Sequence, residues 1–109
     1  MKWSVKFLPE ADKDLDRLTR KQQITVKKAI DKVQTNPLSQ NDGGYGKPLG
    51  HRQGTDLTNL LKTKLAGEGL RIVYRLIRAE TAMLIVVIVI REDEEVYRIA
   101  RQRADRHAL

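Results

Sequence analysis

The sequence predicts an α+β domain with the element order β-α-α-β-β-β-α and a mostly antiparallel sheet. Three observations support this fold class. A short alternating segment comes first, two segments with helical periodicity follow, and three strand-like segments joined by short turns precede a helical tail. A period of two is typical of strands, and recurrence every three or four residues is typical of helices. We expect residues 1–109 to form one domain with its helices on one face of the sheet.

The N-terminal segment predicts one strand followed by a helical hairpin. Residues 3–8, WSVKFL, alternate apolar and polar side chains, and Pro9 ends this strand. Glu10 then suits the positive end of a helix. Apolar residues recur at helical spacing in two groups separated by TRKQQ at 19–23. We expect two helices, or one bent helix, ending at Asn36 before a proline.

The C-terminal half predicts three strands and a last helix. Residues 38–56 are rich in glycine and lack a hydrophobic period, so we expect a long mobile connection there. Strand patterns follow at 57–65, 70–78 and 82–90, and short turns between them favour antiparallel hairpins. The run AMLIVVIVI at 82–90 is typical of a strand buried on both faces. Residues 94–106 have helical spacing.

The composition favours an anionic partner. Lysine and arginine outnumber aspartate and glutamate by 21 to 14, which gives a net charge of +7. In so small a protein this excess favours nucleic acid, although a soluble basic domain without such a partner remains an alternative. The absence of cysteine is consistent with a reducing compartment. The N-terminal stretch lacks the apolar core of a signal peptide, and the longest apolar run is about half a membrane span. We therefore expect a cytoplasmic protein with no membrane contact.

Five side chains form a candidate anion site. Lys62 and Lys64 are two apart on one predicted strand, so they share a face, and Arg71 lies across the following turn. Arg91 ends the long apolar strand, and Tyr97 opens the last helix. Crowded cations repel one another, so such a cluster is easier to explain if an anion binds there. The alternatives are a solvated sheet face, local ion pairs with the EDEE run and a tyrosine in the core.

The tail adds further positive charge. Four arginines on the last predicted helix are candidates for RNA contact or for a solvated helix face: Arg98, Arg101, Arg103 and Arg106. His51 and His107 lie far apart without cysteine partners, which argues against a metal site. The stretch GYGKPLG at 44–50 does not match a phosphate-binding loop, because no serine or threonine follows its lysine. We therefore expect neither a metal nor a cofactor.

Four sequence features together resemble the RelE/ParE toxin superfamily, and its RelE branch most closely. They are KTKL, then GEGLRIVYR, then an apolar strand ending in arginine, then REDEEVYRIA. The resemblance extends over nearly the whole chain. It implies the toxin of a type II toxin–antitoxin system, a ribosome-dependent endoribonuclease that cuts mRNA in the A site. The family's catalytic positions fall on Lys62, Lys64, Arg71, Arg91 and Tyr97.

The resemblance also implies a mechanism and partners. The ribose 2′-hydroxyl attacks its own 3′ phosphate without a metal, with Lys64 as the base and Lys62 assisting. Arg71 stabilises the developing charge, Arg91 lies near the leaving oxygen, and Tyr97 stacks on or orients a base. The implied partners are a cognate antitoxin, in a hetero-oligomer, and the ribosome with its mRNA. Two alternatives stay open: a ParE-like inhibitor of DNA gyrase and a noncatalytic RNA-binding module.

Overall fold

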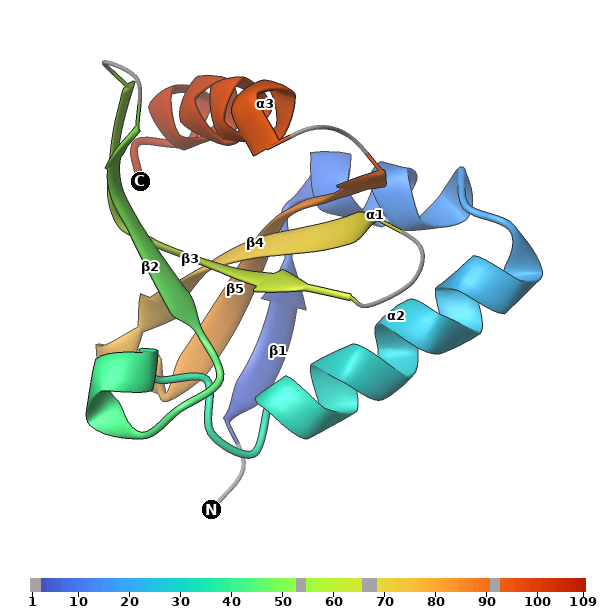
Figure 1. Cartoon of the computed structure of the whole chain (residues 1–109), viewed down its shortest axis with the longest axis horizontal. Helices are drawn as coiled ribbons and strands as arrows, with labels where there is room; N and C mark the ends of the chain where they lie inside the picture. The colour runs from blue at the N-terminus through green and yellow to red at the C-terminus, as the bar shows by residue number, and fades with distance from the viewer. Residues whose placement is uncertain (1–2, 53–54, 66–68, 91–92) are drawn as a thin grey trace.

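The described residues form three α-helices and one five-stranded sheet, which is an α+β architecture (Figure 1). The computed structural model describes residues 3–52, 55–65, 69–90 and 93–109. In chain order the elements are β1 (Ser4–Phe7), α1 (Pro9–Asp16), α2 (Arg20–Val33), β2 (Lys47–Arg52), β3 (Thr55–Lys64), β4 (Leu70–Ile77), β5 (Ala82–Ile90) and α3 (Asp93–Arg106). Two short 3-10 turns, η1 (Gln40–Asp42) and η2 (Arg78–Glu80), precede β2 and β5.

The sheet has the strand order β1-β5-β4-β3-β2. The three pairs β2–β3, β3–β4 and β4–β5 are antiparallel, as the short turns predict. β1 is the exception, because it returns to the edge of the sheet and pairs parallel with β5. The sheet is therefore mostly antiparallel, and β4 lies at its centre between β5 and β3.

The helical segment after β1 is divided into two helices by a cap. Pro9 occupies the first turn of α1, where its missing N–H costs no hydrogen bond. At the start of α2, Thr19 Oγ1 accepts from the Gln22 N–H at 3.2 Å, and Gln22 Oε1 accepts from the Thr19 N–H at 3.0 Å. This capping box satisfies two free donors and fixes the break between the helices. No helix in the described ranges is both long and apolar enough to span a membrane.

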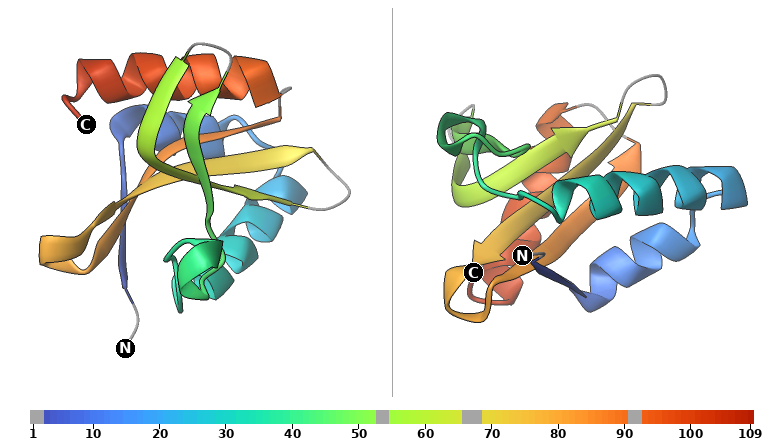
Figure 2. Two further views of the ribbon diagram at one scale, coloured as in Figure 1. Left: turned by 60° about the vertical axis from the view of Figure 1, so that its left-hand side comes forward. Right: turned by 90° about the horizontal axis from the view of Figure 1, so that it is seen from below.

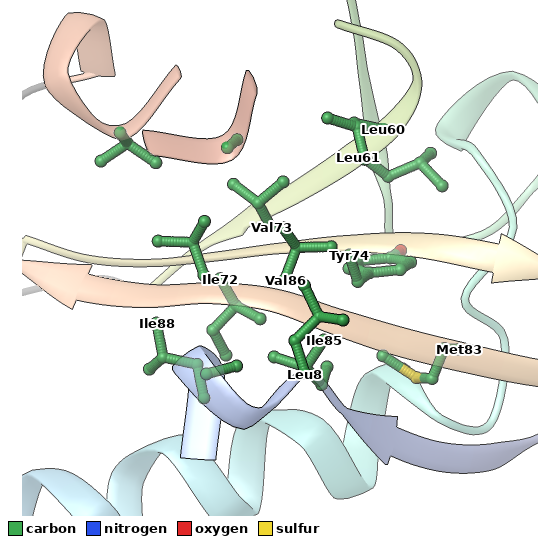
Figure 3. Close-up of a cluster of buried hydrophobic side chains, with 14 of the residues drawn as sticks. Leu8, Leu60, Leu61, Ile72, Val73, Tyr74, Met83, Ile85, Val86 and Ile88 are labelled. Atoms are coloured by element: carbon green, nitrogen blue, oxygen red, sulfur yellow. The ribbon is translucent and has the colours of Figure 1, made fainter. Parts of the chain in front are cut away.

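The helices cover both faces of the sheet, so the prediction of helices on one face was wrong. α1 and α2 lie on one face and α3 lies on the other (Figures 2 and 3). In Figure 3, Met83 and Ile85 point toward the α1 and α2 side, and Val73 points toward α3. Val87 and Ile88 are consecutive in β5, so they point to opposite faces, and both are fully buried. A strand that is apolar on both faces needs a helical layer on each side.

The connection at 38–56 is more ordered than the sequence predicts. It contains η1, the whole of β2 and the first residues of β3, so the expected element order lacks one strand. β2 escapes a pattern search because Pro48 and Gly50 interrupt its alternation. The register with β3 shifts between these two residues, and Gly50 has a φ of +58°. Proline and a bulge are both typical of an edge strand, which is where β2 lies.

A buried ion pair completes the free edge of β5. Pairing with β1 ends at Ile85, and beyond it α1 approaches the strand. The carboxylate of Asp14, which is 4% exposed, accepts the Ile88 N–H at 3.0 Å and both terminal nitrogens of Arg103 at 2.6 and 3.1 Å. Arg103 Nη1 also donates to the Val86 carbonyl at 2.9 Å. Side chains of α1 and α3 therefore satisfy backbone groups that no strand pairs here.

Candidate functional site: a buried lysine–arginine pair beside a lysine-lined hollow

The register of β3 and β4 places three cations on the face that α3 covers. Lys64 is paired directly with Arg71, and Lys62 is paired with Val73. Directly paired residues of antiparallel strands point to the same face, as do residues two apart on one strand. Lys62, Lys64 and Arg71 therefore project together, and Val73 beside them points toward α3 (Figure 3).

Lys62 is held by the first turns of α3. Its residue is 6% exposed, and its Nζ donates to Tyr97 Oη at 2.7 Å while lying 5.2 Å from the centre of that ring. The same Nζ lies 3.2 Å from Asp93 Oδ2. A buried ammonium is costly unless oxygens replace its water, and Tyr97 and Asp93 supply two such oxygens.

Arg71 is the second buried cation, and it shares its anion with Lys62. The residue is 8% exposed, its Nε pairs with Asp93 Oδ1, and its Nη1 donates to the Gly69 carbonyl at 2.8 Å. One carboxylate is thus bound by Arg71 at one oxygen and by Lys62 at the other. The four side chains of Lys62, Arg71, Asp93 and Tyr97 form a cluster that we call the cationic cluster.

Asp93 is ionised in this setting. Partial burial acts to raise the pKa of Asp93, but hydrogen bonds from Arg71 and Lys62 and the charges of both cations outweigh it, so the pKa lies below its ordinary value. Asp93 is also the first residue of α3, where the helix dipole favours a negative charge. Its side chain remains 41% exposed, in contrast to the two cations that it pairs. The anion at this point is therefore accessible from solvent.

A hollow of about 350 Å³ opens beside the cationic cluster. Its lining brings together residues of the η1–β2 segment, β3 and α3, namely Gln40, Tyr45, Lys47, Lys62, Thr63, Lys64 and Asp93. Lys47 is paired with Lys62 in the β2–β3 register, so three lysines come from adjacent strand positions. Lys64 is exposed, and within the described ranges no carboxylate forms an ion pair with it. The hollow is therefore positively charged on its strand side.

Four of the five predicted site residues come together in this region. Lys62, Arg71 and Tyr97 belong to the cationic cluster, and Lys64 lies beside it in the lining of the hollow. Arg91, the fifth, lies outside the described residues. Tyr97 fits both sequence interpretations in part. The residue is 9% exposed, as in a core, while its hydroxyl contacts Lys62 as a site residue would.

The arginines of the tail are engaged within the protein to different degrees. Arg98 is the most exposed, at 69% of its side chain, with Glu95 3.9 Å away. Arg101 donates to the Asp56 carbonyl at 2.8 Å and pairs with Asp105. Arg103 forms a buried ion pair with Asp14, and this position does not support the predicted RNA contact. None of these three lines the hollow.

Sequence reasoning missed Asp93, Tyr45 and Lys47. The EDEE run does mark the start of a helix, but no local pattern indicates which of its carboxylates reaches back to β3 and β4. Lys47 and Tyr45 lie in the segment that was expected to be irregular. The only sequence signal for these two residues is the stretch GYGKPLG at 44–50, in which an aromatic residue and a lysine stand among glycines and a proline. That pattern did not identify them as site residues before the structure was known.

The fold of this chain is that of the RelE toxins. Neither a protein-family model nor a curated protein matches the chain at the level of sequence. Among solved structures, a double-substitution variant of the Escherichia coli RelE toxin in the free state matches with a TM-score of 0.72 and 23% identity. The match covers 94% of this chain and 98% of that one.

Two toxin–antitoxin complexes show the same similarity. The E. coli RelE variant bound to a peptide of its antitoxin RelB has a TM-score of 0.67 and 23% identity, and the match covers 92% of this chain and 95% of that one. The RelBE2 complex of Mycobacterium tuberculosis has a TM-score of 0.59 and 24% identity, over 85% and 95%. At these identities the likeness establishes the fold, and the chain's activity has to be argued from its own residues.

Proposed function

We propose that this chain is the toxin of a type II toxin–antitoxin system and that it cleaves mRNA in the ribosomal A site. The observation that carries the proposal is the cationic cluster, in which Lys62 and Arg71, both more than nine-tenths buried, bind the two oxygens of one accessible carboxylate. A phosphate group offers the same pair of oxygens with the same charge. The RelE fold and the lysine-lined hollow beside the cluster add independent support.

The proposed reaction is attack by a ribose 2′-hydroxyl on the adjacent 3′ phosphate. The new oxygen–phosphorus bond forms as the bond to the 5′ oxygen of the next nucleotide breaks. The products are a 2′,3′-cyclic phosphate and a free 5′-hydroxyl. The reaction needs a base for the proton of the 2′-hydroxyl, stabilisation of negative charge on the phosphate and a proton for the leaving oxygen.

These tasks are assigned to members of the cationic cluster and to Lys64 and Arg91. The scissile phosphate takes the place of the Asp93 carboxylate, and Arg71 stabilises the charge that develops on the phosphate oxygens. Lys62 holds the same phosphate and is positioned by Tyr97 Oη. Lys64, exposed at the edge of the hollow, accepts the proton of the 2′-hydroxyl. Arg91, outside the described residues, is proposed to lie beside the leaving 5′ oxygen and stabilise its charge, and that oxygen takes its proton from water.

The proposed partners are the ribosome with its mRNA and an antitoxin. The two complexes above each hold a RelE toxin with its antitoxin, which supports a hetero-oligomer for this chain as well. A toxin that acts on translating ribosomes works in the cytoplasm. The antitoxin is expected to neutralise growth inhibition and to copurify with the chain.

The direct test of the base assignment uses ribosomes programmed with a defined mRNA. The parent protein should release fragments that carry a cyclic phosphate and a 5′-hydroxyl at the A site, and free mRNA should be cut far more slowly. Lys64→Arg keeps the positive charge but cannot accept a proton, so cleavage should fall by at least ~10²-fold, the scale of general base catalysis. Lys27→Ala, an exposed lysine of α2, is the matched control and should retain full activity.

Three outcomes would contradict the proposal, the first of them for Lys64 alone and the other two for the function as a whole. Full activity of Lys64→Arg would remove Lys64 as the base and leave it a charge only. Inhibition of gyrase supercoiling without mRNA cleavage would identify the ParE-like alternative. Binding to ribosomes or RNA without any cleavage would identify a noncatalytic module.

A further inference from the structure

Tyr45 has an exposed aromatic side chain that the proposed catalytic set does not use. It is 43% exposed, whereas Tyr97 is 9% exposed and Tyr74 is fully buried. It lines the same hollow as Lys47, Lys62 and Lys64. A tyrosine presents a large flat apolar ring with a polar tip, and this ring lies at the rim of a basic hollow, where it is open to a ligand.

The loop that carries Tyr45 is held firmly by backbone hydrogen bonds. The Tyr45 N–H donates to the Asn36 carbonyl at 3.1 Å, and the next N–H, of Gly46, donates to the Leu38 carbonyl at 3.0 Å. The Gly46 carbonyl in turn accepts from the Gln40 N–H at 2.7 Å. Three bonds within a few residues fix the backbone on both sides of the ring.

Both neighbours of Tyr45 are glycines for a steric reason. A Cβ on Gly44 would collide with the Leu38 carbonyl, and a Cβ on Gly46 would collide with the hydroxyl of Tyr74. That hydroxyl is itself fixed, since it donates to the Pro37 carbonyl at 2.8 Å. The loop is therefore packed directly onto the core, and it presents Tyr45 from a rigid base.

The surroundings of the ring suit a nucleic acid. Lys32 Nζ lies 5.2 Å from the ring centre on one side, within the range of a cation–π contact. The ring has a second face, and Lys47 follows two residues later at the start of β2. An exposed ring among lysines that can follow a phosphate backbone is the arrangement by which proteins bind single-stranded RNA.

We infer that Tyr45 is a base-stacking residue for single-stranded RNA whose backbone enters the lysine-lined hollow. This inference rests on the proposed function and adds a substrate contact to it. The family resemblance implies that Tyr97 stacks on or orients a base, but the Tyr97 residue is 9% exposed and its hydroxyl is bound to Lys62. Tyr97 positions Lys62, and Tyr45 contacts the base. Because every base has a flat face, the contact adds affinity with little sequence preference.

Two RNA probes separate stacking from charge. The first is a short fluorescent oligoadenylate, and the second is an abasic strand with the same number of phosphates. Anisotropy titrations should show that the parent protein binds the first probe more tightly. Tyr45→Ala should lose about 10-fold in affinity for oligoadenylate and little for the abasic strand. Tyr45→Phe keeps the ring and should bind as the parent does.

Ile24→Ala is the matched control, because Ile24 is 47% exposed on α2 and lies outside the lining of the hollow. It should change neither affinity. The inference is overturned if the parent fails to prefer oligoadenylate or if Tyr45→Ala binds both probes as the parent does. These titrations need no cleavage, so they decide on Tyr45 even if the ribosomal assay excludes the proposed reaction. In that assay, Tyr45→Ala should raise KM and leave kcat nearly unchanged.

Discussion

At the scale of single residues, two buried cations share one half-exposed carboxylate. Removing an ammonium and a guanidinium from water is costly, and one carboxylate does not offset that cost for two cations. Lys62 gains Tyr97 Oη, and Arg71 gains the Gly69 carbonyl. A cluster with more positive than negative charge is well suited to bind a phosphate in the place of the Asp93 carboxylate, which is the property that the proposed reaction requires.

Removing the Tyr97 hydroxyl should separate positioning from stacking. In Tyr97→Phe the ring remains but Lys62 loses one of its two oxygen partners. We expect the free energy of unfolding to fall by about 1.5 kcal/mol, at the low end for a lost bond to a charged group because Asp93 remains. Ribosome-dependent kcat should fall about 10-fold, the factor that corresponds to about 1.4 kcal/mol. Thermal melting and single-turnover cleavage measure the two effects, and an unchanged kcat would show that Tyr97 does not position Lys62.

The sequence alone was enough to group Lys62, Lys64 and Arg71, because a period of two and one short turn determine a strand face. It could not assign a partner to them. Asp93 is one of several consecutive acidic residues, and only the angle at which α3 crosses the sheet brings this one to Lys62 and Arg71. The position of Tyr45 could not be predicted either. It depends on backbone hydrogen bonds to Asn36 and Leu38, and the segment that carries it has no hydrophobic period.

At the scale of elements, the strands with strong apolar patterns were predicted well and the edge strand was not. The predicted range 82–90 is that of β5, and the predicted range 70–78 is within one residue of β4. Both strands are buried, so packing requires the pattern. β2 lies at an edge with Pro48 and a register shift, so little packing constrains its sequence. The position of α3 opposite α1 and α2 also follows from packing that no local pattern records.

The buried hydroxyl of Thr63 offers an element-scale prediction. Its Oγ1 is buried with no hydrogen-bond partner in the described part of the chain, in surroundings that include Ile30, Val33 and Ile72. Valine has nearly the same shape without the unpaired oxygen. Thr63→Val should therefore raise the free energy of unfolding by about 1 kcal/mol, measured by urea denaturation. Thr58→Val is the control. Thr58 Oγ1 donates a hydrogen bond to Asp56, so removing this hydroxyl should not raise the free energy of unfolding.

The ion pair between α1 and α3 predicts a loss of stability that exceeds that of a surface pair. Asp14→Ala removes the only carboxylate bound to Arg103 in the described residues and leaves an Ile88 N–H unpaired. Its free energy of unfolding should fall by about 3 kcal/mol. Lys6→Ala breaks the exposed pair with Glu80 and should cost less than about 1 kcal/mol. Equal losses in the two variants would contradict a structural role for the Asp14–Arg103 pair.

At the scale of the whole molecule, the C-terminal end of α3 is tied back to α1 through Glu10. His107 Nε2 lies 2.9 Å from Glu10, and Arg106 donates to it at 2.8 Å. The hydrogen bond with His107, assisted by a backbone hydrogen bond and by Arg106, lowers the pKa of Glu10 to about 2 from its ordinary 4.5. This contact joins α1 to the end of α3, two helices that lie on opposite faces of the sheet (Figure 2).

The lowered pKa of Glu10 has a consequence for acid unfolding. Glu10 binds a proton less readily in the folded state than in the unfolded state, so its contribution is fully present above pH 4.5 and is lost as the pH falls toward 2. Glu10→Gln should be less stable than the parent near neutral pH, and the two stability curves should converge in this window. Urea denaturation across the pH range measures both curves. Parallel curves would contradict the role of Glu10, and the exposed Glu94→Gln variant should follow the parent.

The central claim is that the cationic cluster binds and activates a phosphate of mRNA on the ribosome. Arg71→Ala tests it most directly, with Arg75→Ala as a control from the same strand that lies outside the hollow. In ribosomes programmed with defined mRNA, cleavage to a cyclic-phosphate end should fall by at least ~10²-fold in Arg71→Ala, the scale of one lost electrostatic stabiliser. Arg75→Ala should cut as the parent does. Parent-level cleavage by a folded Arg71→Ala protein would contradict the account.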